Sequence, residues 1–259
     1  MPFTETSPSL HWQSWGETGP MVALVHEIGG SIASWEPVAS LLADEFRLLA
    51  LDQRGAGLSE KPRGRLDLED QVDDLEAVLA AAGEAGPLHL AGAAAGAAIV
   101  AGYALRHPDR VTSLALCVPA VESDPRQAAA AGERAALVRR EGMRGLADSA
   151  FAAIYPERIR DGRFADYRGR WLAWDPESYA LLGEALARVR LPLEELRAPC
   201  LLLAGELDPA RPPAAVAELA ERFADARFEC VPDTSHVVPY QAPEDVARRL
   251  RSFFLAPRP

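Results

Sequence analysis

Residues 88–105 hold the feature that most restricts the fold of this chain: a strand, a sharp turn and a helix in direct succession. The apolar run 88–91 is typical of a buried strand, and the apolar run 95–105 is typical of a helix. Between them stands Gly92-Ala93-Ala94-Ala95-Gly96. Glycine at both ends permits a strained turn and a close approach of strand and helix. The sequence therefore predicts a tight turn centred on Ala94, whose side chain is only a methyl group.

Short apolar runs alternate with amphipathic stretches along most of the chain. Strands are predicted over residues 10–15, 21–26, 46–51, 88–91, 112–118, 200–204 and 227–231. Helices are predicted over residues 34–44, 68–82, 95–106, 213–223 and 243–254. Because strands and helices take turns, the predicted fold class is α/β, with a doubly wound and mostly parallel sheet.

The pattern changes between residues 122 and 190, where only helices are predicted. Aromatic residues are concentrated in this segment, namely Phe151, Tyr155, Phe164, Tyr167, Trp171, Trp174 and Tyr179. Most of them are expected to hold a small helical insertion together, and a few to face the site. The predicted division is a core of residues 1–121, a helical cap of residues 122–190 and a second part of the core from 191 to 259.

Length, charge and cysteine content restrict the class of protein. The 259 residues, 49% of them hydrophobic, suffice for one α/β domain with an insertion. A formal charge of -11 and the absence of a dense basic cluster argue against nucleic acid or an anionic membrane as partner. The first twenty residues lack the pattern of a signal peptide, and the three cysteines suit buried, reduced thiols, so a cytoplasmic location is expected. The expected partner is a small-molecule substrate. The sequence does not decide whether the chain forms a homodimer.

Four motifs in order give the chain a resemblance to the α/β-hydrolase superfamily that covers nearly all of it. They are H-E-I-G-G-S at 26–31 with Trp35 downstream, D-Q-R-G-A-G-L-S at 52–59, the turn at 92–96, and the pair G-E-L-D-P at 205–209 and S-H at 235–236. The resemblance implies an α/β-hydrolase fold. It further implies that Asp208 orients His236, which acts as the base, and that the backbone N–H groups of Ile28 and Ala95 form an oxyanion hole near Trp35.

Ala94 occupies the position of the serine nucleophile in this resemblance. Because alanine has no hydroxyl, no acyl-enzyme can form there, and covalent serine catalysis is excluded for this sequence. Asp208 and His236 still provide a dyad for acid-base chemistry. A helix cap at Asp208 and a loop histidine without a role at His236 are the alternatives.

Glu27 is a second departure from the superfamily pattern, which usually has glycine there. A carboxylate beside the Ile28 N–H would raise the energy of an oxyanion, because like charges repel strongly in a low-dielectric pocket. If Glu27 points into the pocket, it is a candidate proton donor or base alongside His236. If it points outward, it is a solvated loop residue. The sequence leaves both alternatives open.

The cap segment 139–148 resembles that of 3-oxoadipate enol-lactonases and related esterases. This implies a small lactone, ester or ketone substrate, with or without a carboxylate, for which Arg126, Arg139 and Arg163 are candidate partners. The alternative for each of the three arginines is a solvated surface charge. Three hypotheses follow: an enzyme that uses acid-base chemistry without a covalent intermediate, an enol-lactonase-like serine hydrolase whose serine was replaced, and a non-catalytic ligand-binding relative. No nucleotide, flavin or metal motif is present, so no cofactor is expected.

Overall fold

A seven-stranded sheet forms the centre of the molecule in the computed structural model, which describes residues 2–5, 7–62 and 64–257. The strands are β1 (Trp12–Trp15), β2 (Met21–Val25), β3 (Arg47–Leu51), β4 (Leu88–Ala93), β5 (Val111–Cys117), β6 (Cys200–Gly205) and β7 (Ala226–Val231). Their order across the sheet is β1-β3-β2-β4-β5-β6-β7, and β1 runs antiparallel to β3 while the pairs from β3 to β7 are parallel. The predicted doubly wound, mostly parallel sheet is confirmed.

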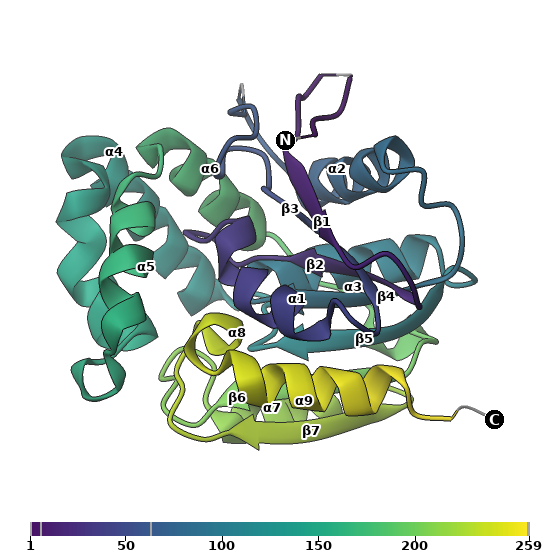
Figure 1. Cartoon of the computed structure of the whole chain (residues 1–259). Helices are drawn as coiled ribbons and strands as arrows, with labels where there is room; N and C mark the ends of the chain where they lie inside the picture. The colour runs from purple at the N-terminus through teal and green to yellow at the C-terminus, as the bar shows by residue number, and fades with distance from the viewer. Residues whose placement is uncertain (1, 6, 63, 258–259) are drawn as a thin grey trace.

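Helices cover both faces of this sheet, as Figure 1 shows. Successive side chains of a strand point to opposite faces, so Val22 and Leu24 of β2 belong to one hydrophobic cluster and Ala23 and Val25 to another. The first cluster includes side chains of α1 (Glu36–Leu42) and α9 (Pro243–Phe254). The second includes side chains of α2 (Leu68–Ala81), α3 (Ala95–Arg106) and α7 (Pro213–Ala220). A parallel sheet buried on both faces explains why its strands are apolar runs without alternation.

The predicted elements differ from the observed ones mainly at their ends. The helix predicted over residues 34–44 is a short 3-10 turn, Ile32–Ser34, followed by α1, which has Pro37 in its first turn. The strand predicted over residues 10–15 begins only at Trp12. Its first residues are held elsewhere, because the Leu10 N–H donates to the Thr4 hydroxyl at 2.9 Å and the His11 N–H donates to Ser59 Oγ at 2.9 Å.

The segment between β5 and β6 is helical and lies beyond one end of the sheet in Figure 1. It contains α4 (Pro125–Ile154), the 3-10 turn Glu157–Ile159, α5 (Gly162–Leu172) and α6 (Pro176–Leu186), and a further 3-10 turn, Leu193–Glu195, precedes β6. All of the aromatic residues singled out above join one cluster in this segment, which also takes in Val237 and Tyr240 from the core. An isolated antiparallel bridge pairs Glu122 with Arg190, at the two positions where the cap is predicted to begin and end. The boundaries of the cap as a domain stay a prediction.

Within the described residues, no helix is both long enough and apolar enough to span a membrane. The short helix α8 (Val238–Gln241) precedes α9 and follows the loop that carries His236.

Candidate active site

The turn at 92–96 has the strained geometry that its glycines predict. Ala94 lies at φ 48° and ψ -109°, in the positive-φ region that side chains rarely adopt. Its N–H donates to the Cys117 carbonyl at 2.9 Å, and its own carbonyl accepts the N–H of Ala97 at 3.1 Å and of Ala120 at 3.2 Å. The end of β4, the start of α3 and the loop after β5 therefore fix this one residue.

Both glycines of the turn are required by close backbone contacts. A Cβ atom at Gly92 would lie 2.4 Å from the Gly96 carbonyl oxygen, and one at Gly96 would lie 2.2 Å from the Val25 carbonyl oxygen. Strand and helix can approach this closely only without side chains at the two positions. The turn places the Ala94 methyl group at the position where a nucleophile would stand. Ala94 is buried, with 6% of its surface exposed.

Asp208 and His236, predicted to form a dyad, are in contact. Asp208 follows β6, His236 follows β7, and the His236 Nδ1 to Asp208 Oδ2 distance is 2.7 Å. The carboxylate is fully buried, whereas 19% of the imidazole is exposed. With Nδ1–H donated to Asp208, Nε2 is left as the basic nitrogen.

The surroundings of Asp208 favour its charged form. Burial by itself raises the pKa of this carboxyl, but the charge and hydrogen bond of His236 and the N–H groups of Ala210 (2.8 Å) and Arg211 (3.1 Å) together lower it below its ordinary value. Asp208 therefore stays ionised at neutral pH and can stabilise a protonated His236.

The loop after β2 is fastened by the turn at residues 52–59. Asp52 accepts the N–H of Ile32 at 2.8 Å and of Leu58 at 3.0 Å. The Gln53 N–H donates to Nε2 of His26 at 3.0 Å. Two of the sequence motifs thus hold each other, and they set the position of Glu27 and Ile28.

Glu27 is buried, with 2% of its surface exposed, so the alternative of a solvated loop residue is wrong. Its Oε1 accepts hydrogen bonds from Ser34 Oγ at 2.8 Å and from the Tyr167 hydroxyl at 3.1 Å. Its Oε2 is also buried and has no hydrogen-bond partner among the described residues. An unpaired buried acceptor costs about 1–3 kcal/mol, and a charged one costs more, so this atom requires an explanation.

Sequence reasoning missed the role of Tyr167 as a partner of Glu27. It placed this residue only among the aromatics of the insertion. The available signal was the hydroxyl itself, since a buried tyrosine normally finds a hydrogen-bond partner. Residues of the insertion also contact the two glycines that follow Ile28. Trp174 Nε1–H donates to the Gly30 carbonyl at 3.0 Å. The Trp171 ring lies 2.5 Å from where a Cβ atom of Gly29 would stand.

The remaining predicted site residues are placed less directly. Ala95 begins α3 and Ile28 is half-buried, and their N–H groups as oxyanion donors stay a prediction. Trp35 is fully buried in the hydrophobic cluster under α1, and its contact with a ligand likewise stays a prediction.

The cap arginines proposed as carboxylate partners have other partners or face solvent. Arg139 pairs with Glu177 and Glu184, and Arg163 pairs with Asp161. Arg126 is exposed.

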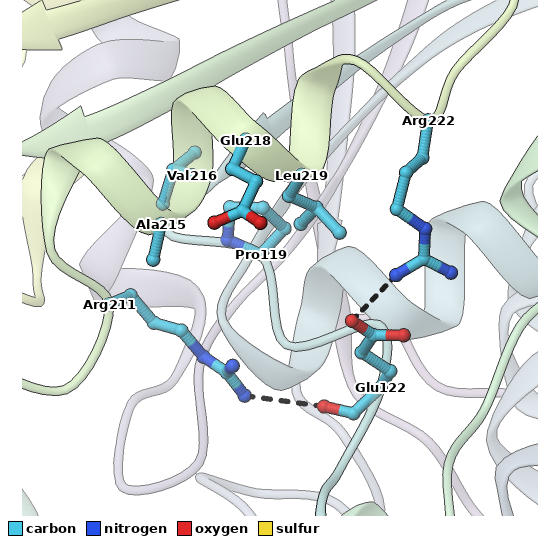
Figure 2. Close-up of a pocket in the computed structure, with 8 residues that line it drawn as sticks. All are labelled: Pro119, Glu122, Arg211, Ala215, Val216, Glu218, Leu219 and Arg222. Atoms are coloured by element: carbon cyan, nitrogen blue, oxygen red, sulfur yellow. Dashed lines mark hydrogen bonds and ion pairs between the residues drawn. The ribbon is translucent and has the colours of Figure 1, made fainter.

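Two cavities have a volume of about 260 Å³ each, and neither is lined by Ala94, Glu27 or His236. One of them borders the loop after β2, since Ser31 and Trp174 are among its lining residues. Figure 2 shows the other, where Glu122 accepts hydrogen bonds from Arg222 at its carboxylate (2.7 Å) and from Arg211 at its backbone carbonyl (3.5 Å). In the part of the chain that the structure describes, no group of three His, Cys, Asp or Glu side chains could hold a metal ion.

The sheet topology, the strained turn and the acid–histidine pair together define an α/β hydrolase. Within this class the chain belongs to the family described as serine aminopeptidase, S33, whose model matches residues 16–240. The predicted resemblance to the superfamily is therefore confirmed.

Relatives and solved structures agree with this assignment. The chain is 26% identical over 247 residues to 2-(acetamidomethylene)succinate hydrolase of Mesorhizobium japonicum, covering 91% of this chain and 88% of that protein. It is also 26% identical over 247 residues to 3-oxoadipate enol-lactonase 2 of Acinetobacter baylyi, covering 93% and 91%. The crystal structure of the enol-lactonase from Burkholderia xenovorans LB400 superposes with a TM-score of 0.91 at 27% identity, covering 98% of this chain and 100% of that one.

Proposed function

We propose that this α/β hydrolase acts on a small lactone, ester or ketone by acid-base chemistry of His236 and Asp208, without a covalent intermediate. The observation that carries the proposal is an intact dyad, with Nδ1 and Oδ2 2.7 Å apart, in a site whose nucleophile position is Ala94. The names of the relatives support a substrate with a carboxylate, since a substituted succinate carries two carboxylates and an enol-lactone of oxoadipate keeps one.

The proposed steps for a lactone use water as the nucleophile. His236 Nε2 accepts a proton from water while the water oxygen bonds to the carbonyl carbon. The N–H groups of Ile28 and Ala95 hold the oxyanion that forms. The bond to the ring oxygen then breaks, and that oxygen takes the proton from His236. Asp208 stabilises the imidazolium in between.

Glu27 gives this site a second proton-transfer group in the proposal. Its carboxylate disfavours a full negative charge on the substrate oxygen that the Ile28 N–H would hold, because like charges repel in a buried site. Acid-base reactions that place less charge on this oxygen than lactone or ester hydrolysis does are therefore further candidates for the same dyad. Decarboxylation, C–C cleavage and a double-bond shift belong to the same class of chemistry.

A second candidate, a serine hydrolase with its serine replaced, is favoured by one observation. Ala94 retains the positive φ of 48° although alanine gains nothing from it. In that case, Ala94→Ser restores hydrolysis through an acyl-enzyme.

The deciding experiment compares the chain with its Ala94→Ser and His236→Gln variants. p-Nitrophenyl acetate tests acyl transfer, and enol-lactones and β-keto acids test the proposed chemistry. We expect the unmodified chain to turn over a member of the second set without a burst, and His236→Gln to lose at least about 100-fold in rate. A burst and turnover in the Ala94→Ser variant alone would support the replaced serine. Ligand binding without turnover in all forms, indifferent to His236→Gln, would support the non-catalytic relative.

A further inference from the structure

The geometry points to a buried acceptor subsite at Glu27 Oε2, preset by Ser34 and Tyr167, that takes an O–H or N–H group of the ligand. Oε1 already accepts two hydrogen bonds, from Ser34 at 2.8 Å and from Tyr167 at 3.1 Å. Oε2 accepts none from the described residues although it is buried. A ligand that donates a hydrogen bond would satisfy this atom, and a ligand without a donor would leave it unpaired.

The carboxylate is held in one orientation by its surroundings. Ser34 follows Glu27 by seven residues along the same loop, and Tyr167 reaches it from α5 of the insertion. Gly30 lies against it, because a Cβ atom at that position would stand 2.4 Å from Oε1. With two donors on Oε1 and backbone packed beside it, the carboxylate cannot exchange its two oxygens without losing both hydrogen bonds.

The loop that carries Glu27 packs against the turn that carries Ala94. Glu27 directly follows His26, and a Cβ atom at Gly96 of the turn would lie only 2.6 Å from the His26 carbonyl oxygen. A buried carboxylate on this loop therefore belongs to the neighbourhood of the candidate active site.

The subsite assigns a substrate class. In an oxyanion hole, N–H donors select a carbonyl oxygen, an acceptor. Here Glu27 directly precedes Ile28, one of the two proposed N–H donors, and its free carboxylate oxygen selects a donor instead. The substrate is thus expected to carry a hydroxyl or N–H group next to the carbonyl carbon that reacts.

A pair of probes that differ in one donor tests this inference, which rests on the proposed function only in the choice of lactones. 2-Hydroxy-γ-butyrolactone and 2-methoxy-γ-butyrolactone both accept hydrogen bonds, but only the first donates one. Dissociation constants follow from titrations of the backbone amide NMR signals of Ile28 and Ala95. We expect the hydroxylated lactone to bind about tenfold more tightly, as a hydrogen bond to a charged group would give.

The Glu27→Gln variant makes the test specific. Because Ser34 and Tyr167 both donate to the Oε1 position, the amide oxygen is expected there and the amide NH₂ at the Oε2 position. The subsite then donates instead of accepting, and the preference for the hydroxyl should fall to about onefold.

Tyr167→Phe is expected to reduce the preference partially, since one of two positioning hydrogen bonds is lost. Tyr179→Phe is the matched control, because Tyr179 belongs to the same aromatic cluster and packs on Trp171 and Trp174. It should leave the preference unchanged.

Two outcomes would overturn the inference: equal binding of the two lactones by the unmodified chain, or a preference that persists in Glu27→Gln. The measurement requires no turnover. A chain that prefers the hydroxylated lactone but turns over nothing would reject the proposed function and leave the subsite standing. Turnover with equal binding would do the reverse.

Discussion

Ala94 has a strained backbone conformation that its own side chain does not explain. Its φ of 48° is held by three backbone hydrogen bonds from neighbouring elements. Strain of this kind costs on the order of 1–3 kcal/mol and persists where the surrounding structure imposes it. Replacing Ala94 with glycine removes the strain together with one methyl group.

The comparison with Ala98→Gly tests for this strain. Ala98 is buried in the middle of α3, and glycine there also removes one methyl group, relieves no strain and adds the cost of about 1 kcal/mol that glycine carries inside a helix. We expect the free energy of unfolding of Ala94→Gly to exceed that of Ala98→Gly by about 2–4 kcal/mol, of which about 1–3 kcal/mol is relieved strain. Urea unfolding followed by circular dichroism measures both. A difference of about 1 kcal/mol or less would mean that Ala94 stores no strain.

The dyad was predictable because the G-E-L-D-P and S-H motifs resemble the acid and base segments of the superfamily, and each follows a predicted strand of a parallel sheet whose strands end at one edge. The Ala94 turn was likewise predictable, since its glycines are dictated by local backbone geometry. The contact between Glu27 and Tyr167 was not. It joins residues 140 positions apart, across an insertion whose packing on the core leaves no local pattern in either segment.

At the scale of elements, α5 and the short connection between α5 and α6 hold the loop that follows β2. Trp171 lies against Gly29, and Trp174 donates to the Gly30 carbonyl at 3.0 Å. The helices were predicted only as an aromatic-rich insertion, because an aromatic spacing along a helix does not reveal which loop the rings contact. The consequence is that small changes in the loop should disturb the insertion.

Gly29→Ala tests this coupling, with Gly83→Ala as its control. Both glycines have positive φ, 88° and 74°, so both variants are strained to a similar degree. A Cβ atom at Gly29 would lie 2.5 Å from the Trp171 ring, whereas one at Gly83 would have nothing within 4 Å. We expect Gly29→Ala to lose about 1–3 kcal/mol more stability than Gly83→Ala, as overpacking does. Tryptophan fluorescence during urea unfolding gives the free energy of unfolding of both variants. A difference near zero would show that the Trp171 ring moves aside without cost.

For the whole molecule, the site links stability to pH. Asp208 has a pKa below the ordinary 3.8, because His236 and two backbone N–H groups outweigh the effect of burial. Asp74 shows the opposite direction, since its burial outweighs the attraction of Arg54 and raises its pKa. In the unfolded chain both carboxyls return to ordinary values, so the two groups contribute to acid stability with opposite signs.

The sign for Asp208 follows from proton counts. Between its lowered pKa in the folded chain and about 3.8 in the unfolded chain, the unfolded state binds more protons. The contribution of Asp208 to the free energy of unfolding is therefore fully present above about pH 3.8. It is lost as the pH falls through the pKa that Asp208 has in the folded chain. Asp208→Asn removes this contribution, so its stability should decline less steeply than that of the unmodified chain as the pH falls below about 4. Urea unfolding at several pH values between neutral and acid gives both curves. Parallel curves would mean that the His236–Asp208 contact contributes nothing to folding and serves the site alone.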